Sequence, residues 1–311
     1  ILLVLVLIRS VMGQTVADIK DVSRAADKVA HGDYDELLPV KTQDEVGELT
    51  RSFNSMVGQL EERIRMKEAL DLAMEVQQNL LPQQALKVGG LDIVGRSIYC
   101  DETGGDYYDF LTFSQNGQKK IGVAVGDVVG HGISAALLMT TVRALLRSRI
   151  SQPGSLSQMV DDVNRLLCKD TSQSGSFMSL FFMLIDTAAK EIEWVRAGHD
   201  PAIIYEPATN SFDELRGEGI VLGVDAQWSY QDNRHSGLNS GQIILTGTDG
   251  IWETENPAGK KFGKDRLRQT IRQHHNGSAE EIIQAIIDAL AAFRQSASQD
   301  DDVTLVVIKA T

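Results

Sequence analysis

The hydrophobic pattern of this 311-residue chain changes its period at Pro82, and this change sets the main limit on the fold. Before Pro82, apolar residues return every three or four positions, which indicates amphipathic helices. After it, short apolar runs separated by turn-forming residues indicate strands. Proline cannot continue a helix and restricts the residue before it, so a helix is expected to end here. The sequence therefore predicts a helical N-terminal part and a C-terminal domain that contains sheets.

Residues 10–62 are predicted to form two helices joined by a polar connector. The first helix is expected to stop at His31-Gly32. In the second helix apolar residues alternate spacings of three and four, the a/d pattern of a coiled coil, and the first helix repeats this pattern more weakly. One chain cannot bury both apolar stripes, whereas two copies would complete a four-helix bundle, so a homodimer is expected. The stripes are Val16, Ile19, Val22, Ala26 and Val29 in the first helix, and Val46, Leu49, Phe53, Met56 and Leu60 in the second.

The first eight residues are all aliphatic and are followed by Arg9. Because a spanning helix needs about 20 apolar residues, residues 1–9 are interpreted as the end of a transmembrane helix with its basic flank in the cytoplasm. A short buried helix or strand is the alternative. A signal peptide is not favoured, since no basic segment precedes the run and no small-residue cleavage site follows it. This interpretation predicts a protein of the inner membrane, with residues 10–311 in the cytoplasm.

The segment 44–49, Asp-Glu-Val-Gly-Glu-Leu, opens the second helix with an Asp-Glu-x-Gly motif. Two helices with this motif, directly after a membrane run, resemble the HAMP signalling module over residues 10–62. The sequence departs from many HAMP modules at Met12-Gly13-Gln14, where a proline is common. An ordinary helical hairpin would explain the periodicity but not the neighbouring membrane run. Residues 63–82 continue as a charged helix, interpreted as a linker that transmits a conformational state, with a passive spacer as the alternative.

Residues 83–311 are predicted to form an α+β domain of layered antiparallel sheets flanked by helices. Meander-like runs of strands, with the helices grouped in pairs, argue against an alternating doubly wound sheet. The predicted strands are 91–99, 107–113, 121–127, 177–186, 191–197, 202–205, 229–234, 242–246 and 303–308. The predicted helices are 132–148, 156–170, 264–273 and 278–296.

Charge and cysteine content limit the possible partners. The net charge of -13 argues against nucleic acid, because duplex binding depends mainly on cations that neutralise phosphates. Proteins and small phosphoesters remain as candidates. Cys100 and Cys168 fit no metal-ligand spacing and no disulfide framework, which favours a reducing compartment and packing roles for both.

Four aspartates stand where apolar strands meet glycine-rich or acidic loops: Asp106, Asp127, Asp249 and Asp301. Magnesium and manganese prefer oxygen ligands and retain several waters, so a few such carboxylates can leave positions open for substrate and a nucleophilic water. Each motif alone is weak, since Asp-Gly is a common turn and Asp-Asp is usually a solvated pair. The occurrence of all four motifs in this order within one domain is a more specific signal than any one of them alone.

Together these motifs resemble the SpoIIE and RsbU branch of the PP2C, or PPM, metal-dependent protein phosphatases. A HAMP module ahead of such a domain is similar to SiaA-type membrane phosphatases. The matching segments are Leu-Leu-Pro at 80–82, Gly-Gly-Asp-Tyr-Tyr-Asp at 104–109, Gly-Asp-Val-Val-Gly-His-Gly at 126–132, Ala-Gly-His-Asp-Pro at 197–201, Thr-Asp-Gly-Ile at 248–251 and Asp-Asp-Val-Thr at 301–304.

The resemblance implies a centre of two Mn²⁺ or Mg²⁺ ions. Asp127 would bridge the ions, Asp106 would hold one, and Asp249 and Asp301 the other. The backbone carbonyl of Val128 would complete the ligands, at a position where the family often has glycine.

Two points about the site are left open: which of Asp301 and Asp302 is the ligand, and what His131 does. Alignment favours Asp301 over Asp302 as the ligand. His131 is either the general acid for the leaving group or a structural residue of its turn. His199 is expected to support the site by packing.

The resemblance implies hydrolysis of phosphoserine or phosphothreonine by direct attack of metal-activated water, on a protein partner of the anti-anti-sigma, STAS type. One alternative is a diguanylate-cyclase-like nucleotide enzyme, suggested by the Gly-Gly-Asp sequence at 104–106, although Tyr107 replaces the second acid that such an enzyme needs. The other alternative is a catalytically inactive PP2C-like module that only binds a partner.

Overall fold

The computed structural model describes residues 2–34, 37–100, 103–115 and 118–311. Ile1, where the predicted membrane segment begins, lies outside the described residues. The chain divides into two compact units, residues 1–72 and residues 73–311. We call them the helical unit and the catalytic unit, the second after the activity that its sequence motifs predict, and describe each by itself.

The helical unit consists of α1 (Leu2–Ala30) and the first part of α2 (Glu45–Leu80). Its core is formed by Ala25, Phe53 and Val57. The first helix ends at Ala30, as the His31-Gly32 sequence predicts. Among the described residues, no helix combines the length and the apolar character that crossing a bilayer requires.

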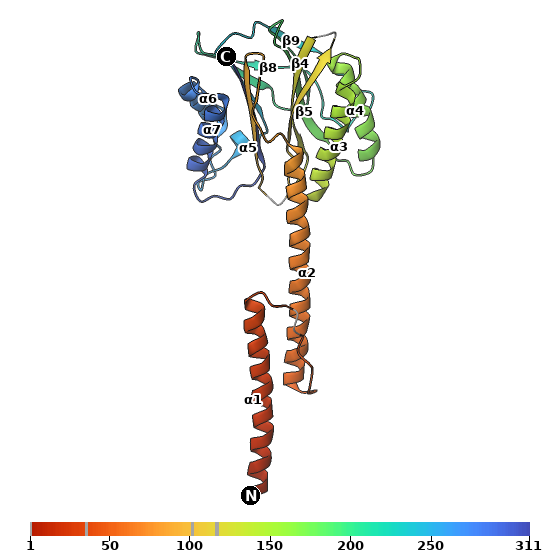
Figure 1. The fold of residues 1–311 in the computed structure, drawn as a ribbon, viewed down its shortest axis with the longest axis vertical. Coiled ribbons are helices and arrows are strands. Elements are labelled where there is room, and N and C mark those ends of the chain that lie inside the picture. Colours follow the sequence, from red (N-terminus) through yellow and green to blue (C-terminus); the bar gives the residue numbers. More distant parts are fainter. Residues whose placement is uncertain (1, 35–36, 101–102, 116–117) are drawn as a thin grey trace. The chain divides into compact units, whose positions relative to one another are not determined.

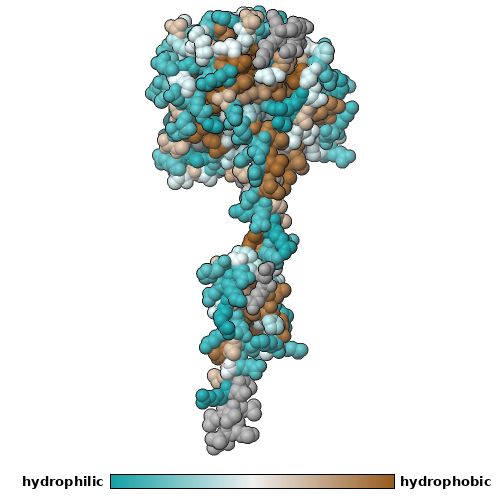
Figure 2. Space-filling model, viewed as in Figure 1, coloured by the Kyte–Doolittle hydropathy of each residue, from teal (hydrophilic) through white to brown (hydrophobic). Residues whose placement is uncertain are grey.

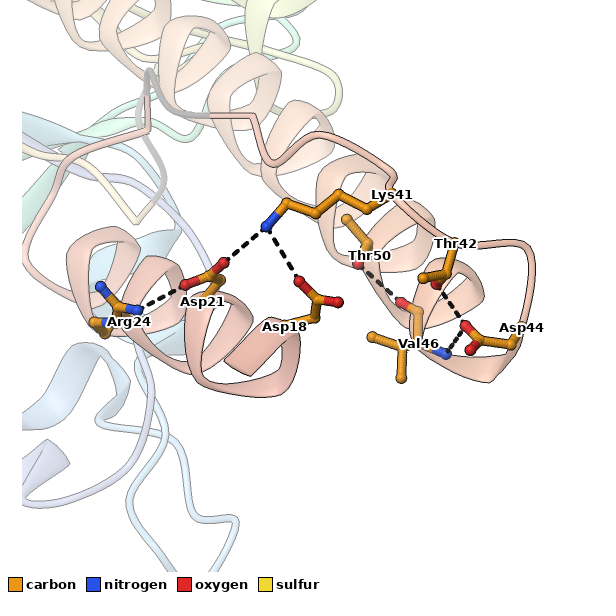
Figure 3. Close-up of polar contacts among 8 residues, drawn as sticks. All are labelled: Asp18, Asp21, Arg24, Lys41, Thr42, Asp44, Val46 and Thr50. Atoms are coloured by element: carbon orange, nitrogen blue, oxygen red, sulfur yellow. Dashed lines mark hydrogen bonds and ion pairs between the residues drawn. The ribbon is translucent and has the colours of Figure 1, made fainter. Parts of the chain in front are cut away.

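The connector of the helical unit is fixed by polar contacts, several of which are drawn in Figure 3. The ammonium group of Lys41 lies 3.1 Å from a carboxylate oxygen of both Asp18 and Asp21. Asp44 caps α2 by accepting the backbone N–H groups of Val46 and Gly47, at 3.1 and 3.2 Å. A Cβ at Gly47 would lie 1.9 Å from the carbonyl oxygen of Thr42, which explains the glycine of the Asp-Glu-x-Gly motif.

The catalytic unit contains two antiparallel sheets, in agreement with the predicted α+β sandwich. The six-stranded sheet has the order β1-β2-β11-β10-β7-β8, and the five-stranded sheet has the order β3-β4-β5-β6-β9. The strands of the first sheet are β1 (Leu86–Val88), β2 (Leu91–Ile98), β7 (Ala202–Glu206), β8 (Ser211–Leu215), β10 (Ile243–Gly247) and β11 (Val303–Ala310). Those of the second are β3 (Tyr107–Gln115), β4 (Gln118–Val128), β5 (Met178–Asp186), β6 (Glu191–Ala197) and β9 (Asn233–Ser236).

Helices cover the outer faces of these sheets. Figure 1 shows α3 and α4 on one side of the sheets and α6 and α7 on the other. Capping boxes begin two of the helices, at Ser155 with Gln158 and at Ser278 with Glu281. The helices are α3 (Ile133–Ile150), α4 (Leu156–Thr171), α5 (Gly250–Glu253), α6 (Gly263–His274) and α7 (Ala279–Arg294).

The central strands β10 and β11 of the six-stranded sheet are apolar on both faces because each face is covered. In β10, Ile244 belongs to the hydrophobic cluster between the two sheets, whereas Ile243 and Leu245 belong to the cluster under α6 and α7. In β11, Val306 and Val307 divide in the same way. Figure 2 shows that hydrophilic residues occupy much of the visible surface.

Sequence-based predictions of the edge strands were less accurate. The strand predicted at 229–234 is wrong over most of its length, since β9 spans only Asn233–Ser236. The backbone N–H of Tyr230 instead donates to Asp161, and the Tyr230 hydroxyl donates to the carbonyl of Ile220. The edge strands β1 and β8 and the short helix α5 were not predicted.

Candidate metal centre

The four aspartates lie at neighbouring strand ends because the sheets are antiparallel. Asp106 directly precedes β3 and Asp127 lies near the end of β4, and Tyr107 pairs with Gly126 between them. In the other sheet, Asp249 follows β10 and Asp301 precedes β11. Each sheet therefore contributes two of the aspartates from the adjoining ends of a strand pair.

Hydroxyl groups connect the two sheets at Asp106. The Thr248 hydroxyl donates to the Asp106 carboxylate at 2.9 Å, and it accepts the backbone N–H of Thr304 at 3.0 Å. Since Thr248 directly precedes Asp249, this contact joins the loop after β10 to the start of β3.

The carboxylates raise one another's pKa. Asp106 is buried, and burial, followed by repulsion from Asp127 and Asp302, holds the pKa of its carboxyl well above the usual range. Burial, followed by repulsion from Asp249, Asp301 and Asp302, raises the pKa of Asp127 to about 7. These groups are close enough for the charge of one to oppose the ionisation of another.

Asp249 and Asp301 are more exposed than Asp106. Burial, followed by the charges of Glu253 and Asp200, raises the pKa of Asp249. Burial is likewise the largest cause of the raised pKa of Asp301, to which the charge of Asp249 contributes. A divalent cation would relieve this shared repulsion, so the donor set suits a hard metal ion.

The described residues do not form a finished ligand set. In that part of the chain, no three His, Cys, Asp or Glu side chains converge closely enough to hold a metal ion as they stand. The structure brings Asp106, Asp127, Asp249 and Asp301 into one electrostatic group, and the assignment of each as a ligand stays a prediction.

Two glycines allow the backbone beside Asp106 to pack closely. A Cβ at Gly105 would lie 2.8 Å from the carbonyl oxygen of Val128, the predicted backbone ligand. A Cβ at Gly104 would lie 2.0 Å from a carboxylate oxygen of Asp302 and 2.2 Å from the Tyr99 ring. Gly105 also accepts the backbone N–H of Val128 at 3.3 Å. The Gly-Gly-Asp sequence is therefore required by contacts on both sides.

The two acids before β11 have different environments. Asp302 is buried and accepts the backbone N–H of Cys100 at 2.9 Å. Asp301 is exposed and accepts the backbone N–H of Asp302 at 2.8 Å. Asp302 thus has a structural hydrogen bond, while the Asp301 side chain remains accessible to solvent and to a ligand.

The two histidines of the motifs also differ. His131 is exposed between Gly130 and Gly132, both of which have positive φ, near 80°. His199 is buried, with Nδ1 2.8 Å from the Ser179 hydroxyl and Nε2 3.1 Å from the carbonyl oxygen of Gly247. Burial lowers the pKa of His199 to about 4, so the ring is neutral and donates to Gly247. The predicted packing role of His199 is confirmed.

Sequence reasoning missed other residues around this centre. Gln77 was predicted only as part of the linker helix, but its side chain is buried and hydrogen-bonded to Gly104. Asp109 was given no role, although it is buried and forms two hydrogen bonds with Arg147, at 2.6 and 2.7 Å. Gln77 was missed because a polar residue within a helical pattern gives no indication of a partner as distant in sequence as Gly104. Arg143 and Arg147 are four residues apart and therefore share one face of the predicted helix. This pair of positive charges was the available sequence signal that an acidic partner such as Asp109 lies nearby.

Comparison with known proteins agrees with this architecture. The family of Stage II sporulation protein E (SpoIIE) matches residues 117–311, and the HAMP domain matches residues 11–62. The phosphoserine phosphatase RsbU of Bacillus subtilis is 30% identical over 245 residues, which make up 78% of this chain and 70% of RsbU. The chain spans 52% and 59% of two further curated relatives.

Solved structures share the fold. The SiaA PP2C domain of Pseudomonas aeruginosa has a TM-score of 0.66 at 21% identity, covering 80% of this chain and 98% of that domain. The catalytic domain of the serine/threonine phosphatase PstP, solved with two manganese ions, has a TM-score of 0.51 at 13% identity, covering 70% of this chain and 97% of that domain. At these identities the likeness concerns the fold.

The catalytic unit therefore has the fold of a PP2C-type protein serine/threonine phosphatase, and the helical unit contains a HAMP domain. The chain belongs to the SpoIIE family. The resemblance of residues 104–106 to a diguanylate cyclase loop is superficial. Tyr107, at the position of the second acid, is a buried core residue of β3.

Proposed function

We propose that this protein is a signalling phosphatase that removes phosphate from phosphoserine or phosphothreonine of a partner protein, using two Mn²⁺ or Mg²⁺ ions. The main observation is the group of aspartates from both sheets whose pKa values are raised by burial and mutual repulsion. RsbU, which is named a phosphoserine phosphatase, supports the substrate class. PstP, with its two manganese ions on the same fold, supports the metal.

The carboxylates of Asp106, Asp127, Asp249 and Asp301 and the backbone carbonyl of Val128 would hold these ions. When bound, the ions would supply an activated water and neutralise charge on the phosphoryl oxygens. The hydroxyl of Thr248 holds Asp106 in place by donating a hydrogen bond to its carboxylate.

His131 is exposed on the loop that follows β4 and Asp127, so its ring is accessible to solvent. In this proposal it gives a proton to the departing serine or threonine oxygen. His199 stays neutral and holds the backbone at Gly247, two residues before Asp249.

The purified chain is expected to hydrolyse p-nitrophenyl phosphate with Mn²⁺ and to lose that activity with EDTA or in the Asp127→Ala variant. The loss in the variant is expected to be on the order of 1000-fold, since the metal ions contribute several kcal/mol to the transition state. Matched far-UV circular dichroism spectra would show that the variant folds. Full activity in EDTA would exclude the metal mechanism, and inactivity of the folded, metal-bound wild type would favour the binding-module alternative.

The partner proposed from the family resemblance is a phosphorylated STAS-type regulator. Phosphorylated candidates are to be incubated with the wild type and with Asp249→Ala, and phosphate release measured. Release by the wild type alone supports the assignment. Equal release by both would contradict the role of Asp249.

The proposed assembly is a homodimer joined through the HAMP and linker helices and attached to the inner membrane by an upstream helix that ends at residues 1–9. The exposed apolar side chains of the helical unit support the dimer, because a second copy would bury them. Light scattering of the purified chain measures its mass directly.

A further inference from the structure

Two hollows of different charge lie near the candidate metal centre of the catalytic unit. The smaller, about 210 Å³ in volume, has four acidic side chains and one lysine among the described residues of its lining. The larger is an open groove of about 680 Å³ that is lined by three basic and three acidic side chains, again among the described residues. The basic residues of the groove are Arg196, Arg216 and Lys264. Since the whole chain carries a net charge of -13, this groove is a place where a negatively charged ligand meets less repulsion.

Arg196 connects the groove to the candidate metal centre. Its guanidinium group donates to the carbonyl oxygen of His199, and the His199 ring in turn contacts the carbonyl oxygen of Gly247, two residues before Asp249. The same guanidinium group donates to the carbonyl oxygen of Gly217 at 2.9 Å. Arg196 thus lies between the loop at Gly217, which lines the groove, and the strand end that carries Asp249.

Lys264 connects the groove to the centre a second time. Its ammonium group pairs with Asp200 at 2.8 Å and lies over the Trp252 ring, 4.4 Å from the ring centre. Trp252 belongs to α5, the short helix that directly follows Asp249. A ligand in the groove would therefore lie close to a phosphoester bound at the predicted metal ions.

Arg216 is the most accessible cation of the groove, with a side chain that is 80% exposed. It pairs with Glu214 at 2.9 Å, and Arg268 pairs with the other carboxylate oxygen of Glu214 at 3.0 Å. Because Arg268 would still neutralise Glu214, Arg216 can turn toward an incoming carboxylate without leaving a lone buried charge behind.

Two edge strands border the groove. Its lining includes Glu214 of β8 and Asn233 of β9, and each of these strands is the last of its sheet. The outer side of an edge strand presents backbone N–H and C=O groups that an extended segment can bind. These groups favour a polypeptide over a small phosphoester as the occupant of the groove.

We propose that the groove lined by Arg196, Arg216 and Lys264 binds an acidic segment that neighbours the phosphorylated residue of the partner protein. This inference rests on the proposed phosphatase function and adds to it the class of sequence that the enzyme selects. The basic side chains attract carboxylates of the segment, whereas the acidic hollow near the centre repels them.

The test compares phosphoserine peptides of one sequence that carry glutamates before or after the phosphoserine, or glutamines in their place. The first quantity is kcat/KM of the full chain with Mn²⁺ for each peptide. The second is the binding of fluorescently labelled, unphosphorylated glutamate and glutamine peptides to the metal-free protein, measured by polarisation. Hydrolysis of p-nitrophenyl phosphate reports separately on the centre itself.

The test variant is Arg216→Glu, and Arg234→Glu is its matched control. Arg234 lies on β9, is 69% exposed and pairs with Glu193 at 2.9 Å, as Arg216 does with Glu214. Lys120 lies 3.9 Å from Glu193, so this acid also has a second cation nearby. Both variants add the same charge change at an exposed arginine, but Arg234 is outside the described lining of the groove.

The wild type should prefer the glutamate peptide, in at least one of its two arrangements, by roughly 10-fold in kcat/KM, the effect of one charge-assisted hydrogen bond. Arg216→Glu should abolish this preference and the tighter binding of the labelled glutamate peptide, because it replaces attraction by repulsion. Arg234→Glu should keep both. High salt should reduce the preference of the wild type. If Arg216→Glu does not fold, Arg216→Gln, which removes the charge without adding one, takes its place.

Equal kcat/KM for the glutamate and glutamine peptides in the wild type would overturn the proposal, as would an equal loss of preference in Arg234→Glu. If the wild type hydrolyses neither the peptides nor p-nitrophenyl phosphate, the proposed function fails. Binding of the labelled peptides to the metal-free protein then still decides whether the groove selects acidic segments.

Discussion

The helical unit and the catalytic unit differ in how much apolar surface a single chain covers for itself. The hydrophobic cluster of the helical unit has three buried residues, whereas the catalytic unit buries extensive clusters on both faces of its six-stranded sheet. Along the predicted stripes of the helical unit, Ile19 and Met56 remain 46% and 52% exposed. The catalytic unit buries most of its apolar surface within one chain, whereas the helical unit leaves apolar side chains of its stripes exposed, which is the observation behind the proposed dimer.

Charged groups follow the same division. Lys41 meets Asp18 and Asp21 at the surface of the helical unit, where solvent screens the pair. In the catalytic unit, the Asp109 carboxylate is fully buried and is neutralised by Arg147, with Arg143 3.8 Å away. The partly exposed pairs of Lys41 are therefore expected to contribute less to stability than the pair of Arg147 with the buried Asp109.

The largest effect is expected for Arg147→Met, which leaves the Asp109 carboxylate buried without its main partner. Because Arg147 is partly exposed and Arg143 remains nearby, we expect a loss of about 3 kcal/mol in the free energy of unfolding, at the lower end for a broken buried pair. Urea denaturation followed by tryptophan fluorescence measures this, since Trp194, Trp228 and Trp252 all lie in the catalytic unit.

The surface pair of Arg24 with Asp21 provides the matched comparison in the helical unit. Arg24→Met should leave the catalytic unit unchanged and have no measurable effect on thermal unfolding. Equal losses for Arg147→Met and Arg24→Met would contradict the proposed difference between the units.

Met56→Glu tests the incomplete surface of the helical unit. A dimer would bury this side chain in both copies, at about 1.5 kcal/mol each, so the dimer dissociation constant should rise about 100-fold. Sedimentation equilibrium measures the change. Ser55→Glu adds the same charge at a neighbouring exposed position outside the stripe and should leave the constant unchanged. A monomeric wild type, or equal effects of both variants, would remove the argument for a dimer.

The two units also differed in what their sequences could predict. In the catalytic unit, central strands such as β4 and β11 were found because both faces are apolar, and the candidate aspartates followed from motifs. The strand β9 was misplaced because its residues are polar and it is defined by pairing with β6, which no local pattern encodes. Gln77 was missed for a similar reason, since its partner Gly104 is distant in sequence. Alignment already favoured Asp301 over Asp302, and the structure adds that Asp302 is buried and accepts a hydrogen bond from Cys100.

The smallest predicted effect concerns pH and His199. The folded protein keeps His199 neutral down to about pH 4, whereas the unfolded chain protonates near 6.5, so the unfolded state binds more protons in between and stability falls as the pH falls. For the metal-free protein, His199→Gln removes this loss. The stability difference between wild type and variant should therefore shrink by about 2 kcal/mol from pH 7 to pH 5.

Ser179→Ala separates this titration from the hydrogen bond that His199 makes with Ser179. The variant loses the hydroxyl but keeps the buried imidazole, so its stability should follow the pH dependence of the wild type at a lower level. Urea denaturation at several pH values, followed by tryptophan fluorescence, compares the three proteins in the catalytic unit. A constant difference between wild type and His199→Gln would mean that His199 is accessible to protons in the folded state. The hydrogen bonds by which His199 connects Ser179 to Gly247 would then open to solvent more readily than the buried position of the ring indicates.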